Sequence, residues 1–281
     1  MNDLWSNIIL VVLIQGLFAL SLLLLIPARR KKYENRHLLL ILLTIFWFLL
    51  EFYCIRNKIK IPINVFYGTR YGSWLLLGPL TYFFIKSISS HWKFKRKDLL
   101  HVIPFALFVL IIPLASGESL SNRQIHYGML AVFDYRPKTV TFFEYSYSTI
   151  FYLQFIHLVG YLVINHFNLK RYTKKMKSSY AQTSNIVWLF VFNGLLFLIL
   201  IFSLSFLYIL FASDIYSRAL DYIYVVPMGL FIYAMTYKLS GFEWKKPQGV
   251  DLRYRSSNLK PEQQNKLQKA LEERMSKKSC F

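Results

Sequence analysis

The chain has 281 residues, of which 55% are apolar and 18% aromatic, and its formal net charge is +20. The apolar residues gather in blocks of about 20, the length that an α-helix needs to cross the roughly 30 Å hydrocarbon core of a bilayer. These blocks are apolar on every side, which argues against a soluble bundle, because the surface helices of a soluble protein need a polar face.

Seven such blocks follow one another, and they predict an all-α integral membrane protein with seven transmembrane helices. The expected spans are residues 7–26, 37–55, 67–86, 99–116, 143–165, 185–212 and 219–238. The first block has its basic run after it rather than before it, so we expect a true span and not a cleaved signal peptide. Polar or charged residues interrupt the third, fifth and seventh blocks.

The distribution of charge predicts the orientation of these spans. If the N-terminus is outside, the inner loops are residues 27–36, 86–98 and 166–184, and they hold fifteen Lys and Arg against two acidic residues. Loops rich in Lys and Arg stay in the cytoplasm, so we predict an outer N-terminus and an inner C-terminus, in a bacterial cytoplasmic membrane. This arrangement explains the basic composition without a nucleic-acid partner.

Five polar residues within or at the ends of the predicted spans are candidates for a signal pocket or an ion pair: Glu51, Arg70, Gln154, His157 and Asp221. A charge in the membrane is costly unless it has a partner. Glu51 and Arg70 have opposite signs and matching expected depths near the outer surface, so they form either a structural ion pair or part of a pocket for a small signal. Gln154 and His157 share one helix face.

Prolines interrupt several predicted spans. Gly78 and Pro79 lie in the middle of the third span and Pro227 near the middle of the seventh, while Pro104 falls in the fourth. A proline within a helix removes one backbone hydrogen bond and bends the helix, so these positions are candidate hinges or packing kinks. Trp74 is expected at the membrane interface, where tryptophan is common.

The sequence holds no sign of an enzyme. The phosphate-binding, dinucleotide-binding and zinc-protease motifs are missing, and so is C-x-x-C. We therefore expect no catalytic residues, no cofactor and no metal site. The lipid bilayer is the expected partner.

Residues 1–240 form the predicted membrane domain, and residues 241–281 form a cytoplasmic linker with a short amphipathic helix. On that helix Leu267, Leu271 and Met275 recur at spacings of four residues and make one narrow apolar stripe. Such a helix is marginal by itself in water. It needs a second copy of the chain, a membrane surface or a following domain as its partner, and a homodimer through this helix is one of these expectations.

Three segments resemble the membrane-bound AraC-type transcription regulators. They read LLLGPLTYFFIKS (75–87), FKRKDLLHVIPF (94–105) and YRSSNLKPEQQNKLQKALEERM (254–275). The resemblance covers about residues 5–275. It implies a multi-span sensor that a short connector helix joins to a cytoplasmic domain with two helix-turn-helix units. It carries over no ligand-binding residues.

Only six residues follow Met275. The resemblance therefore implies that this chain ends before the DNA-binding domain and has no specific DNA binding by itself. The chain is expected to be a truncated product, a fragment, or a sensor whose output is a separate protein. The leading expectation is a membrane domain that senses an unknown small signal. A small transporter or channel is the alternative, and a membrane enzyme acting on lipid is a third.

Overall fold

The computed structural model describes residues 4–30, 32–57, 59, 72–89, 92, 94–108, 142–175, 180–213, 222–241 and 265. All regular secondary structure in these residues is helical. The chain divides into two compact units, residues 1–244 and 245–281, and the helices below belong to the first unit. The predicted connector residues Leu267, Leu271 and Met275 lie outside the described residues.

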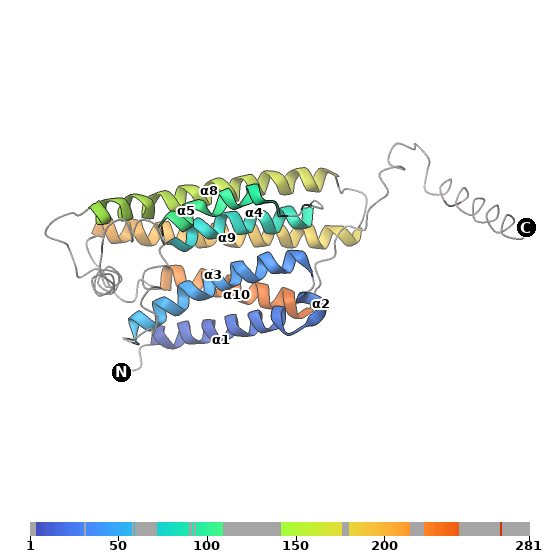
Figure 1. Ribbon diagram of the computed structural model, residues 1–281. Helices are drawn as coiled ribbons and strands as arrows, with labels where there is room; N and C mark the ends of the chain where they lie inside the picture. The colour runs from blue at the N-terminus through green and yellow to red at the C-terminus, as the bar shows by residue number, and fades with distance from the viewer. Residues whose placement is uncertain are drawn as a thin grey trace, which may run out of the picture. The chain divides into compact units, whose positions relative to one another are not determined.

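Figure 1 shows the helices of the first unit side by side. Their bounds are α1 Leu4–Leu24, α2 Pro27–Arg30, α3 Tyr33–Arg56, α4 Ser73–Ser89, the 3-10 helix η3 Arg96–Val102, α5 Ile103–Ala106, α8 Phe142–Lys175, α9 Tyr180–Ser213 and α10 Tyr222–Gly241.

Four of these helices are long and apolar enough to cross a membrane. The crossing segments are Ser6–Leu24, Tyr33–Cys54, Ile186–Ile209 and Tyr222–Ser240. Their lengths of 19 to 24 residues match the thickness of the hydrocarbon core. They coincide with the predicted first, second, sixth and seventh spans, within a few residues at each end.

The remaining predicted spans have a different character. Helix α4, in the third, has only 17 described residues. Helix α8, in the fifth, has 34 residues and extends ten residues beyond the predicted span into a polar and basic segment. The total of seven spans and their orientation therefore stay predictions.

The start of the predicted fourth span is not a regular α-helix. Residues Arg96–Val102 form a 3-10 helix, at whose start the Asp98 carboxylate accepts a hydrogen bond of 2.7 Å from the Lys95 backbone N–H. Pro104 then lies in the first turn of α5. Proline is favourable there because the first N–H groups of a helix have no intrahelical partner. Pro104 therefore lies at a helix start in the described residues, and the predicted fourth span stays a prediction.

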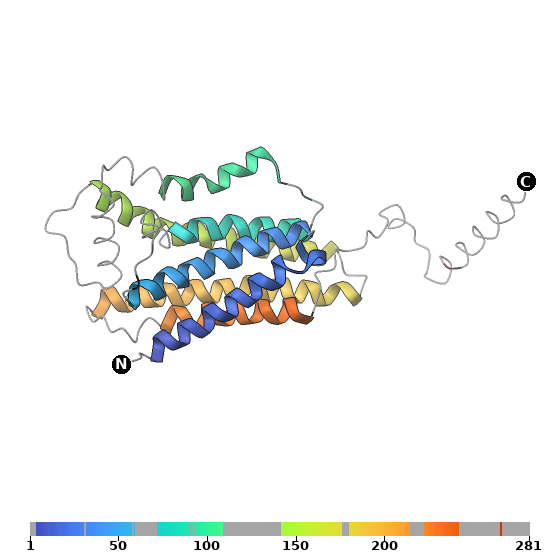
Figure 2. The ribbon, with the colours of Figure 1, turned by 60° about the horizontal axis from the view of Figure 1, so that its bottom comes forward.

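The six long helices form a closed ring. Contacts run from α1 to α3, then to α4, α8, α9 and α10, and α10 packs against α1 again. The views in Figures 1 and 2 agree with this order. Helices α1, α4, α8 and α10 run in one direction, whereas α3 and α9 run in the other (Figure 1). Helices α1 and α10, which are far apart in the sequence, are therefore direct neighbours.

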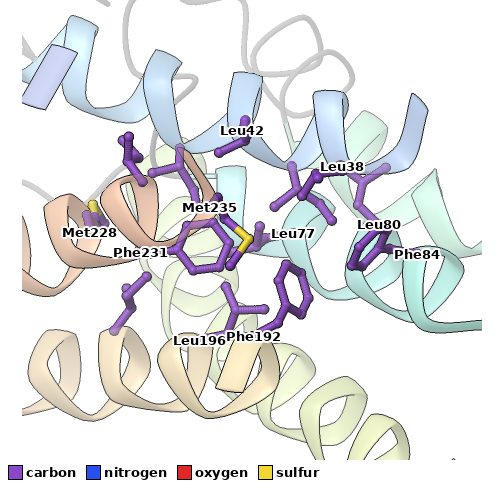
Figure 3. Packing of buried hydrophobic residues seen from close by; sticks show 14 of the residues in the cluster. Leu38, Leu42, Leu77, Leu80, Phe84, Phe192, Leu196, Met228, Phe231 and Met235 are labelled. Carbon is purple, nitrogen blue, oxygen red and sulfur yellow. The ribbon is translucent and has the colours of Figure 1, made fainter. Parts of the chain in front are cut away.

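Large apolar side chains from all six long helices form one buried cluster in the described ring. Figure 3 labels some of those that α3, α4, α9 and α10 contribute. The rings of Phe84 on α4 and Phe192 on α9 have centroids 4.9 Å apart, and Phe231 on α10 follows Phe192 at 5.5 Å. All three are fully buried. Lipid tails are as apolar as leucine, so this packing stabilises the ring through close van der Waals contact more than through removal of water.

Helix α10 approaches α1 closely at a glycine. A Cβ atom added to Gly229 would lie 2.9 Å from Cγ2 of Val12. Real Cβ atoms essentially never come this close to another heavy atom. Small residues allow membrane helices to pack backbone against side chain in this way. Pro227, one of the predicted hinges, is buried only two residues away, and α10 continues through it as a helix.

Candidate functional site

The structure describes three of the five predicted pocket residues. Glu51 on α3 and Gln154 on α8 are both fully buried, and His157 on α8 is half-buried. Arg70 and Asp221 lie outside the described residues. The predicted pair of Glu51 and Arg70 therefore stays a prediction.

Glu51 and Gln154 lie at the same level of the bundle, on opposite sides of α4. Phe48, one turn from Glu51, contacts Trp74 at a centroid distance of 5.9 Å, and Trp74 contacts Phe155, the neighbour of Gln154, at 6.1 Å. Trp74 is 5% exposed, and its ring packs between helices. Its expected place near the membrane interface stays a prediction. No hydrogen bond joins Glu51 to Gln154.

The Gln154 side chain lies in an unusual environment. It is 0% exposed, and neither its oxygen nor its nitrogen has a hydrogen-bond partner among the residues that the structure describes. One turn further along α8, Nδ1 of His157 is also buried without a partner. Most buried polar groups in proteins are hydrogen-bonded, and an unpaired one costs about 1–3 kcal/mol.

Tyr161 connects this region to α4 and η3. Its hydroxyl is 2.5 Å from Nδ1 of His101, and its ring makes an edge contact with His157 at a centroid distance of 4.8 Å. The Tyr161 ring also packs against Gly78 on α4. A Cβ atom added to Gly78 would lie 2.8 Å from Cδ2 of Tyr161. The absence of a side chain at Gly78 therefore leaves room for the Tyr161 ring. Its predicted role as a hinge stays a prediction.

Hydrogen bonds continue along the α4–α8 contact. The Thr81 hydroxyl donates to the Gly78 carbonyl at 2.7 Å, beside Pro79, and Asn165 Nδ2 donates to the Thr81 hydroxyl at 3.2 Å. The Asn165 oxygen is a further buried atom without a partner. We refer to Gly78, Thr81, His101, Gln154, His157, Tyr161 and Asn165 together as the α4–α8 site.

An aromatic cluster borders this site. The Lys86 ammonium lies 4.9 Å from the centroid of the Tyr82 ring and 5.0 Å from that of Trp92. Trp92 stacks on Phe83 at 5.2 Å. Cation–π contacts of this kind contribute about 0.5–2 kcal/mol. They hold the segment after α4 against the bundle.

Sequence reasoning missed His101, Tyr161 and Asn165 as site residues. His101 and Tyr161 are 60 residues apart in the chain, and the segment 94–105 that contains His101 carries over no ligand-binding residue. The one available signal was a histidine inside a predicted span. His101 and His157 both have this property.

The site has the chemistry of a binding site for an uncharged, hydrogen-bonding group. Gln154 presents an acceptor and a donor side by side, and His157 adds a nitrogen about one helical turn away. Among the residues that the structure describes, no three His, Cys, Asp or Glu side chains gather as metal ligands. Comparison with protein-family models, with curated proteins and with solved structures gives no match.

Proposed function

We propose that this chain is a membrane-embedded signal-sensing domain and that the α4–α8 site receives a small, polar, uncharged signal. The observation that carries the proposal is the fully buried Gln154 amide, which has no hydrogen-bond partner in the described part of the chain. Polar groups kept inside a membrane bundle at a cost in stability are typical of functional sites. A ligand that pairs with both amide atoms would recover the cost and stabilise one arrangement of α8 against α4.

The ring of helices supplies a route from this site to the end of α10. Helix α8 packs on α9, where the Asn193 amide donates to the Leu162 carbonyl at 3.3 Å. Helix α9 contacts α10 through Phe192 and Phe231. We propose that binding shifts α10 about Pro227 and so changes the segment that follows Gly241. The resemblance to membrane-bound AraC-type regulators motivates this proposal that the signal passes toward the C-terminal segment. In that proposal, the segment acts in the cytoplasm of a bacterial cell.

A transporter or channel receives less support. Such proteins build their substrate sites from polar groups or unwound helices near the centre of the membrane. In the described part of the chain, the centre of the ring is instead filled by Phe84, Phe192 and Phe231 (Figure 3).

The test is the variant Gln154→Leu, which has nearly the same volume and no unmade hydrogen bonds. We expect it to be more stable than the wild type by about 1–3 kcal/mol in detergent, because the unpaired amide is gone. In cells that carry the gene naturally, we expect it to abolish the transcript changes that separate wild type from a deletion strain. Gln15→Leu on α1, where Gln15 is only half-buried, is the matched control and should change neither property.

Two results would contradict the proposal. One is a Gln154→Leu strain whose transcripts match the wild type under every condition in which the deletion strain differs. The other is a deletion strain with no transcript difference at all, which would remove transcriptional signalling as the function.

A further inference from the structure

The turn between α1 and α3 borders a half-open pocket with a volume of about 300 Å³. It lies at the right-hand end of the bundle in Figure 1, where α2 joins the two helices. Its lining residues are Leu23, Leu24, Arg30, Asn35, Arg36 and Leu39. Half of this lining is aliphatic and the other half consists of two cations and an amide.

The position of the pocket fits a membrane interface. One crossing segment ends at Leu24 and the next begins at Tyr33, so the pocket lies where two spans leave the hydrocarbon core. Arg30 and Arg36 are both exposed. The leucines continue toward the membrane interior, where Leu40 and Leu43 are also exposed on α3. A molecule in this pocket would therefore place one end at the charged rim and the other along apolar helix surface.

Asn35 contributes a buried amide, held in place by a hydrogen bond, to the lining of the pocket. Its side chain is only 5% exposed, and its Nδ2 donates to the Arg29 carbonyl at 3.1 Å, which fixes the amide. The Oδ1 atom of the same amide is buried and has no hydrogen-bond partner among the described residues. An acceptor held in this way can receive a hydrogen bond from a hydroxyl group of a ligand.

We propose that this pocket binds an anionic phospholipid whose headgroup carries a hydroxyl, as in phosphatidylglycerol. The Arg30 and Arg36 guanidinium groups bind the phosphate, the Asn35 oxygen accepts a hydrogen bond from the headgroup hydroxyl, and the leucines contact the acyl chains. Arginine suits phosphate because its N–H groups match the phosphate oxygens in pairs. Basic pockets between membrane helices are a known setting for anionic headgroups. This inference is independent of the proposed function.

The experiment measures lipid binding to the purified full chain by native mass spectrometry in a neutral detergent. Three lipids with the same acyl chains are compared: phosphatidylglycerol, phosphatidylmethanol and phosphatidylcholine. We expect phosphatidylglycerol to bind most tightly. Phosphatidylmethanol keeps the charge and lacks the hydroxyl, so it should bind several-fold more weakly, and phosphatidylcholine should bind weakest.

Variants locate the binding. Arg30→Gln and Arg36→Gln should each weaken phosphatidylglycerol binding about five-fold, since each removes one cation next to the phosphate. Arg171→Gln is the matched control, because Arg171 is also an exposed arginine in a predicted inner loop but lies on α8. It should leave the affinity unchanged.

A free phosphate ester is the competing source of the same chemistry. Glycerol phosphate, which has no acyl chains, should not displace phosphatidylglycerol at equal concentration. Equal displacement by glycerol phosphate would overturn the lipid proposal, and so would equal weakening by Arg171→Gln. Equal binding of phosphatidylglycerol and phosphatidylmethanol would overturn the role of Asn35, and this last comparison needs no variant that could misfold.

Discussion

Replacement of Gly78 by alanine tests the closest contact in the α4–α8 site. The added Cβ would lie 2.8 Å from Cδ2, 3.2 Å from Cγ and 3.4 Å from Cβ of Tyr161. The first distance is too short for any real contact, so α4 or Tyr161 must move. The ring cannot simply turn away, because its hydroxyl is held by His101. An overpacked site of this kind costs about 1–3 kcal/mol.

Alanine also favours a helix over glycine by about 1 kcal/mol, and this gain offsets part of the cost. The control Gly160→Ala separates the two effects, because an added Cβ at Gly160 has no neighbour within 4 Å. We therefore expect Gly160→Ala to be as stable as the wild type or slightly more stable. Gly78→Ala should be less stable than Gly160→Ala by about 1–3 kcal/mol, the cost of the overpacked contact.

The assay is a titration with SDS of the protein in detergent micelles, which yields a free energy of unfolding for each variant. A double variant with Tyr161→Ala completes a cycle: without the Tyr161 ring, Gly78→Ala should lose most of its penalty. If Gly78→Ala and Gly160→Ala prove equally stable, or if the cycle shows a coupling below about 0.5 kcal/mol, the close contact does not exist in the folded protein.

Three further predictions concern the ring and its orientation. Gly229→Ala should destabilise the protein and Val12→Ala should rescue it, since Cγ2 of Val12 lies 2.9 Å from the added atom; an equal cost in both backgrounds would contradict the α1–α10 contact. In the same unfolding assay, truncation of the fully buried ring in Phe192→Ala should cost about 3–5 kcal/mol, whereas Phe167→Ala, at a position 56% exposed, should cost little. Reporter fusions after residues 32, 97 and 177 should all report the cytoplasm, because the basic loops hold them there; two outer reports would refute the predicted orientation.

The sequence by itself determined, to within a few residues, where four helices long and apolar enough to cross a membrane lie. Hydropathy over about 20 residues is a local property, so a window of sequence contains all the information that the prediction needs. The 3-10 helix and the proline in the first turn of α5, at the start of the fourth predicted span, were not predicted, because an apolar window does not specify the type of helix.

Only the tertiary structure decided which face of each helix is buried and which helices meet. In a soluble bundle the polar face would reveal the buried one, but helices that are apolar on all sides carry no such pattern. The contacts of Trp74 with Phe48 and Phe155 were therefore not predictable from the sequence. For the same reason the closure of α10 on α1 was not predictable. It depends on small residues such as Gly229 fitting side chains from a distant segment, and that complementarity exists only in three dimensions.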